Sequence, residues 1–150
     1  MQFLLRIAFL IFNLLANASG ALITTATISE SSMVQTSINT ITITLQADVE
    51  LLSSDVVTIT GLTGSQTIDT AALVLSGTDA AIFGAATPST SAWTQITGVL
   101  VLTTNTGVAA NTDIVVIIQL RNPSAAQTAV TPSVAITGSV TIASTTFASA

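Results

Sequence analysis

Two carboxylates near the end of one predicted strand have the spacing that glycoside hydrolysis uses. Asp48 and Glu50 are separated by one residue in "TLQADVEL", so on a strand both would point to one face, about 7 Å apart. Glycosidases hold their two carboxyl groups roughly 5 to 9 Å apart. Any Asp-x-Glu on a strand meets that spacing, and a solvated strand end explains the pair without chemistry. We therefore expect no enzyme.

The composition removes most other catalytic chemistry. The chain has no cysteine, histidine, tyrosine or lysine, so thiolate and imidazole metal ligands are absent and a serine nucleophile has no base to activate it. The formal net charge is −5 with two arginines. Because phosphate backbones are bound by clustered basic side chains, nucleic acid is excluded as an expected partner.

Calcium is the metal that this composition accommodates, because it binds carboxylate and carbonyl oxygens. Asp55, Asp69, Asp79 and Asp113 each lie at a predicted turn, and they are the candidate ligands. No EF-hand loop pattern is present, and aspartates at turns also accept local backbone N–H bonds. We expect the second role and no resident cofactor, with calcium left open.

The N-terminus has the layout of a secretory signal peptide. Arg6 precedes the apolar run 7–15, and Ala16-Asn17-Ala18 has small residues at the positions that signal peptidase reads. The run is about half of the ~20 residues that a transmembrane helix needs. We expect residues 1–20 to be cleaved, giving a secreted or cell-surface protein without a membrane span. Arg121 is then the only cation, and we expect it to pair with a turn carboxylate or pack its stem on a sheet.

Alternation of apolar and polar residues predicts strands through most of the remaining chain. The expected strands are residues 24–29, 38–51, 56–60, 71–76, 99–104, 114–118, 133–137 and 139–143. In "GTDAAIFG" we expect a single helical turn, capped by Asp79, that inserts Ile82 and Phe83 into the core. Residues 87–93 are predicted to be a loop that leads to Trp93.

Seven or eight short strands separated by turns predict an all-β, two-sheet sandwich, immunoglobulin-like, in one domain over residues 21–150. A barrel is the alternative. "IVVII", residues 114–118, is apolar at both parities, which predicts a central strand covered on both faces or a strand at the waist of a sandwich. The inter-sheet cysteines and corner tyrosine of true immunoglobulin domains are absent. The chain stops at "TIASTTFASA" without a clear closing turn, so C-terminal truncation is also an expectation.

Five motifs follow one another in the order "NTITITLQADVEL", "VTITGLTGSQT", "SGTDAAIFG", "AWTQITGVLVLTT" and "LRNPSAAQTAVTPSVAITGS". Together, over residues 28–140, they resemble a β-rich repeat module of large secreted or cell-surface proteins of algae and other aquatic protists. The resemblance implies an extracellular β-sandwich used in tandem, and it brings no catalytic residues. This chain departs from it in carrying a single copy.

The polar side of the strands is built from hydroxyls, as in "TITIT" at residues 40–44. Threonine pairs well across strands, while sheet edges are normally guarded by lysine, which this chain lacks. We therefore predict a structural or assembly module of a surface layer, fibre or matrix that joins copies of itself or related surface proteins through strand edges. Residues 21–29 or 139–147 are the candidate added strands.

Two other functions stay open. The first is an adhesion module that binds glycan or calcium through the loops at one end of the sandwich. The second is ice binding, which would require Thr-x-Thr arrays on several adjacent strands, whereas only residues 40–44 carry a long one.

Overall fold

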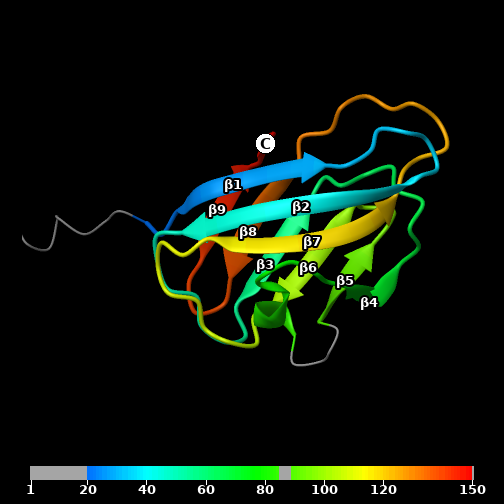
Figure 1. The fold of residues 1–150 in the computed structure, drawn as a ribbon. Coiled ribbons are helices and arrows are strands. Elements are labelled where there is room, and N and C mark those ends of the chain that lie inside the picture. The colour runs from blue at the N-terminus through cyan, green and yellow to red at the C-terminus, as the bar shows by residue number, and fades with distance from the viewer. Residues whose placement is uncertain (1–19, 85–88, 150) are drawn as a thin grey trace, which may run out of the picture.

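The computed structural model describes residues 20–84 and 89–149, so almost all of the predicted signal peptide and the C-terminal residue lie outside the described residues. Two β-sheets pack face to face (Figure 1). The four-stranded sheet contains, in spatial order, β10 (Ala148–Ser149), β1 (Ile23–Glu30), β2 (Ile38–Ala47) and β7 (Ile114–Arg121). The six-stranded sheet contains β4 (Thr70–Val74), β5 (Thr90–Thr94), β6 (Val99–Thr103), β3 (Val56–Thr60), β8 (Ser133–Thr137) and β9 (Ile142–Thr146).

The predicted all-β sandwich is confirmed. One sheet places β1, β2 and β7 side by side and the other places β3, β8 and β9 side by side, which matches the A–B–E and C–F–G strands of an immunoglobulin-like sandwich. The strands β4, β5 and β6 widen the second sheet beyond that pattern. The described residues form ten strands where seven or eight were expected, because β5 and the short β10 were not predicted.

Alternation along each strand decides which side chains face the core. In β2, Ile41, Ile43 and Leu45 are buried, while the threonines between them face outward and are half-buried. The largest fully buried side chain is Trp93, which is 2% exposed and donates its indole N–H to the Thr67 carbonyl at 2.9 Å. Apart from Trp93, Phe83 and Phe147 the buried core is aliphatic, so burial of isoleucine, valine and leucine supplies most of the driving force for folding.

Three predicted segments differ from the structure. The last predicted strand, residues 139–143, is displaced to β9, Ile142–Thr146, because residues 138–140 form a bend. The strand predicted over residues 38–51 ends at Ala47, and a bend follows. Leu51 then forms only an isolated bridge with Val108. Trp93, predicted to follow a loop, lies inside β5, where its inward side chain pairs across the sheet with Leu100. Residues 87 and 88 of that predicted loop lie outside the described part.

The strand β7 is not central, as "IVVII" suggested, but stands at the margin of the four-stranded sheet. Its outward side chains Val115 and Ile117 are half-buried, because another segment covers this margin. Ser76 exchanges both backbone hydrogen bonds with Ile117, at 2.9 and 2.8 Å. The Asp79 carboxylate accepts the Val115 N–H at 2.8 Å. The apolar run therefore reflects a covered edge.

The single helical turn is confirmed as a 3₁₀ helix, η1 (Ala80–Phe83), and Phe83 is buried as expected. Ile82 is partly buried and packs against the same core. Asp79 stands at its N-cap position but makes no side-chain capping bond, so its predicted capping role is wrong. Its carboxylate is used to cover β7 instead.

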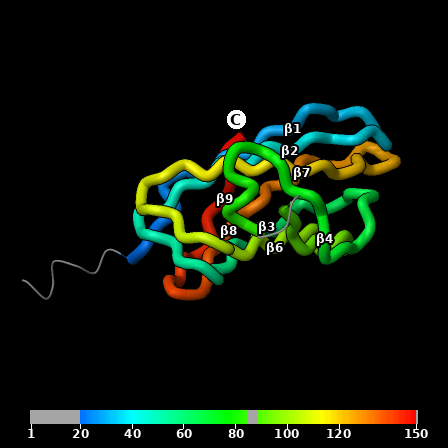
Figure 2. The backbone as a smooth tube through the Cα atoms, turned by 60° about the horizontal axis from the view of Figure 1, so that its bottom comes forward, coloured from blue at the N-terminus to red at the C-terminus, as the bar shows by residue number. Residues whose placement is uncertain are grey.

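The C-terminal segment crosses between the sheets. After β9 the buried Phe147 donates its N–H to the Pro132 carbonyl at 3.0 Å, and β10 then runs parallel to β1, opposite Thr27 and Ile28. Figure 2 shows the C-terminus close to β1. Both terminal segments that were expected to join other copies are thus paired within the chain, β1 on both sides and β9 on one.

Replacing Leu102 with alanine tests whether the side chains that face the core provide most of the stability. Leu102 is 0% exposed, while its neighbour Thr103 on β6 is exposed. Leu102→Ala should lower the free energy of unfolding by about 2 to 5 kcal/mol, and the control Thr103→Ala by about 1 kcal/mol or less. Urea unfolding followed by tryptophan fluorescence measures both. Equal losses would mean that the inward and outward faces are misassigned.

Candidate functional site

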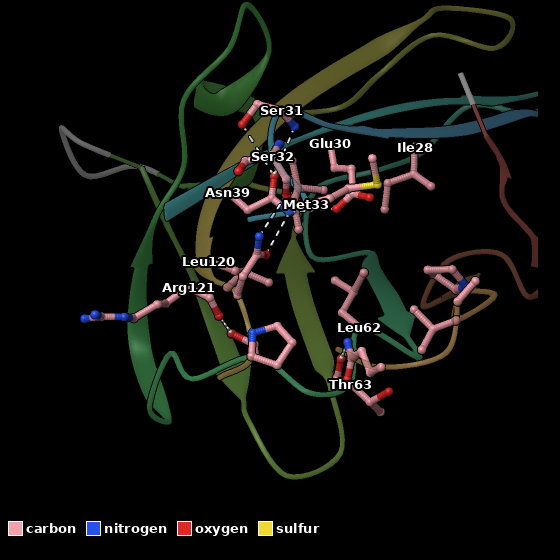
Figure 3. A pocket seen from close by; sticks show the side chains of 18 of the residues that line it. Ile28, Glu30, Ser31, Ser32, Met33, Asn39, Leu62, Thr63, Leu120 and Arg121 are labelled. Atoms are coloured by element: carbon pink, nitrogen blue, oxygen red, sulfur yellow. Dashed lines mark hydrogen bonds between the residues drawn. The ribbon is translucent and has the colours of Figure 1, made fainter. Parts of the chain in front are cut away.

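An open pocket of about 840 Å³ lies at one end of the sandwich (Figure 3). Its walls come from the loop after β1, the loop after β3 and the long loop between β7 and β8. The apolar part of the lining consists mainly of Ile28, Ile41, Leu62, Leu120, Pro132 and Phe147. The remaining walls are mostly hydroxyl and amide side chains, so the pocket joins an apolar floor to a polar rim.

Asn39 organises one wall of this pocket. It is 3% exposed, and its side-chain oxygen accepts the N–H groups of Ser31 and Ser32 at 3.0 and 3.1 Å. Its amide nitrogen donates to Glu30 at 2.7 Å and to Asn122 at 3.0 Å. Because every polar atom of this buried amide is satisfied within the protein, Asn39 fixes the loop after β1 against β7.

Asn122 continues the same network into the long loop. Its amide nitrogen donates to the carbonyls of Ser32 and Val34, at 2.8 and 3.0 Å. Its own N–H donates to the Ser37 carbonyl at 2.9 Å, and the Thr36 N–H donates to Pro123 at 3.0 Å. These hydrogen bonds hold the loop after β1 against the start of the long loop between β7 and β8.

The described residues that line the pocket include two ionisable side chains, Glu30 and Arg121. Glu30 accepts the Asn39 amide, while the Arg121 side chain extends away from the other labelled residues in Figure 3. The Arg121 backbone is engaged, because its carbonyl accepts from Gln66 and Ser65 and its N–H donates to Thr67. This arrangement offers hydrogen bonds and apolar contact, with no paired carboxylates for acid–base work.

Asp55, one of the four calcium candidates, is a buried structural carboxylate that is 1% exposed. It accepts the Ser139 hydroxyl at 2.7 Å, the Leu52 N–H at 2.8 Å and the Ser139 N–H. Burial opposes its charge, but these hydrogen bonds outweigh that cost and hold the pKa of the Asp55 carboxyl below its ordinary value. A side chain at Gly138, which has φ of +134°, would collide with this carboxylate. The cluster joins the start of β3 to the turn after β8.

The other three candidates serve separate parts of the chain. Asp69 accepts the Gln95 N–H at 2.6 Å, Asp113 accepts the Gln46 amide at 2.9 Å, and Asp79 covers β7 as described above. In residues 20–84 and 89–149, no three acidic side chains gather as a metal site would require. The structure does not bring the four aspartates together.

Asp48 and Glu50 do not lie on a strand, although the sequence predicted that they would. Asp48 lies in the bend after β2 and accepts the Leu22 N–H at 2.7 Å, while Glu50 is exposed in the following loop. The spacing expected for a strand therefore does not apply. Asp48 instead fastens the start of β1 to the end of β2.

The helical content of the described part is the short turn η1, and no helix there could cross a bilayer. A scan against protein-family models finds none that matches this chain, and a search of curated proteins likewise finds no match.

Sequence reasoning missed the residues that build the pocket rim and the Asp55 cluster. Neither Asn39 nor Asn122 was singled out from the sequence as a site residue. Their contact joins residues 83 positions apart, so no local spacing pattern encodes it. The position of Gly138 next to a serine was the available sign of a tight turn, but its partner Asp55 is 84 positions from Ser139.

Asp55→Asn should destabilise the protein and change its acid sensitivity. The amide cannot accept all three donors, so we expect a loss of about 1 to 3 kcal/mol in unfolding free energy at neutral pH. Because the folded pKa lies below the unfolded value of about 3.9, the charge stabilises the fold above that value. This stabilisation disappears as pH falls through the folded pKa.

The test compares urea unfolding of wild type and Asp55→Asn between neutral and strongly acidic pH. The difference between them should shrink below about pH 4. The control Asp113→Asn, at an exposed carboxylate with one amide partner, should cost much less. A difference that persists unchanged in acid would contradict the role assigned to Asp55.

Calcium should leave the melting temperature unchanged. A ligand that binds only the folded state stabilises it in proportion to the logarithm of its concentration over Kd, and the four aspartates form no shared site. The measurement is a thermal melt with millimolar calcium chloride, with magnesium chloride as the ionic-strength control. A calcium-specific rise would reveal a site that these positions do not explain.

Proposed function

We propose that this protein is a non-catalytic extracellular structural module that assembles with copies of itself into a surface layer, fibre or matrix through its strand edges. The resemblance to surface repeat modules and the signal-like N-terminus agree with this proposal. The observation that carries it is the distribution of charge over the sandwich. Charge is what normally keeps the faces and edges of sheets apart.

Every charged residue of the described part lies at a strand end or in a loop. Glu30 and Arg121 are the last residues of β1 and β7, and the others, all in loops, are Asp48, Glu50, Asp55, Asp69, Asp79 and Asp113. The two broad faces are therefore uncharged. An evenly neutral sheet surface lets copies approach without desolvating an ion, which would cost several kcal/mol.

The outer face of the four-stranded sheet shows what replaces charge. Cross-strand register places Thr27 opposite Thr44 and Ser29 opposite Thr42, which makes a hydroxyl array two strands wide. On the other side of β2 the face continues with Ile117 opposite Thr42. The array thus gives way to apolar side chains at the third strand, so it falls short of the several strands that ice binding would require.

The adhesion alternative has no specific observation in its favour among the described residues. The four aspartates proposed as calcium ligands lie apart from one another. At the pocket rim, the side-chain amides of Asn39 and Asn122 are already hydrogen-bonded to other groups of the protein. Exposed apolar side chains do lie at the six-stranded sheet, where Ile68 is 74% and Val74 is 53% exposed. Such side chains near an unguarded edge favour association between copies.

The purified protein should form particles much heavier than one chain, growing with concentration. Light scattering gives the mass and electron microscopy of the same sample shows whether the particles are regular. Because the contacts carry little charge, raising the salt concentration should not dissolve them. A mass of one chain at every concentration would rule out the structural proposal.

A further inference from the structure

We propose that copies add head to tail through the six-stranded sheet, with β9 of one copy pairing with β4 of the next. This inference rests on the proposed assembly function and names the strands that carry it. A continuous sheet would then run through successive molecules. The argument depends on which sheet margins are closed within the chain and which are open.

The four-stranded sheet is closed at its β7 margin. Along β7, the backbone of Val115 bonds to Asp79, that of Ile117 to Ser76, and that of Arg121 to residues 65–67. At the other margin, β10 has two residues and pairs with Thr27 and Ile28 of β1. Among the described residues, no strand pairs with residues 23–26 of β1 on that side, which leaves a shorter stretch than the five-residue strands at the margins of the six-stranded sheet.

The six-stranded sheet ends at β4 and β9, which lie at its opposite margins (Figure 1). Both strands have five residues, so their ladders match in length. Both expose most of their side chains, and neither contains a charge or a proline. Charge and proline are two of the features by which edges in monomeric proteins avoid pairing, and both edges lack them. Both edge strands are short, and each pairs with its inner neighbour through a register irregularity, between Thr70 and Leu73 for β4 and between Val134 and Ile136 for the β8–β9 pair.

Strand direction permits a repeating addition. Every neighbouring pair in this sheet is antiparallel. Since the sheet has an even number of strands, β4 and β9 run in opposite directions. The β9 edge of one copy is therefore antiparallel to the β4 edge of the next copy in the same orientation, and a head-to-tail contact of this kind generates an open filament.

Pairing β4 with β4 of a second copy would also be antiparallel, but it would close a dimer and leave both β9 edges unpaired. The head-to-tail contact pairs both kinds of edge in every copy except the last at each end. The head-to-tail contact also explains why neither β4 nor β9 carries a charged side chain. The two arrangements make different predictions for single-edge variants.

The test uses two variants, each with one lysine on one of the two edges, in a chain that otherwise has no lysine. Ala72→Lys guards β4 and Ser144→Lys guards β9, and both positions are exposed, so the fold should tolerate them. Gln119→Lys on the covered strand β7 is the control of equal charge. Circular dichroism checks folding, and Val74→Lys and Ala143→Lys replace any variant that does not fold.

Light scattering of each variant and of mixtures gives the answer. Wild type and Gln119→Lys should polymerise, while Ala72→Lys and Ser144→Lys should each remain at the mass of one chain. An equimolar mixture of the two edge variants should have twice that mass, because each supplies the edge that the other has lost. This doubling on mixing is the specific mark of a β9-to-β4 contact.

Three results would overturn this inference. Dimers of Ser144→Lys alone would indicate β4-to-β4 pairing. Edge variants that polymerise like wild type would indicate contact through the broad faces, and the assembly function would survive. Wild-type protein that stays at one chain mass would instead remove the assembly function itself, together with the edge contact that depends on it.

Discussion

The constraint on which this structure depends is that its strands contain no charge except at their ends. Apolar side chains alternate with hydroxyls and small residues, so burial on the inner faces drives folding while the outer faces remain neutral. The charged side chains of the described residues therefore lie in loops or at strand ends, and the loop carboxylates hold segments together. Asp55, Asp79 and Asp48 each accept a backbone N–H from a distant part of the chain or from the turn beside it.

This use of carboxylates joins segments of a chain that has no cysteine and therefore no disulfides. Asp79 holds the segment before η1 against β7, and Asp55 holds the turn after β8 against the start of β3. Both contacts are hydrogen bonds to a charged acceptor, which are stronger than those between neutral groups. The Asp79 contact also closes the β7 margin of the four-stranded sheet, whereas β4 and β9 stand at the margins of the six-stranded sheet.

Much of the fold could be predicted because alternation is a local signal. The strands at residues 56–60 and 133–137 were predicted with their observed bounds, and the buried Phe83 followed from the turn around it. What failed depends on long-range partners. The margin position of β7, the bend after Ala47 and the Asn39–Asn122 contact are set by segments far away in the sequence, which a local pattern does not contain. The roles of the aspartates were half right, since turn aspartates do accept backbone N–H groups, but mostly from distant segments.

Amide hydrogen exchange on the assembled protein tests the central claim most directly, because it reports which backbone groups become protected. The account predicts that Thr70–Val74 and Ile142–Thr146 gain protection on assembly, while β7, already covered within the chain, does not change. Protection that appears elsewhere and leaves β4 and β9 as exposed as in dilute solution would contradict it.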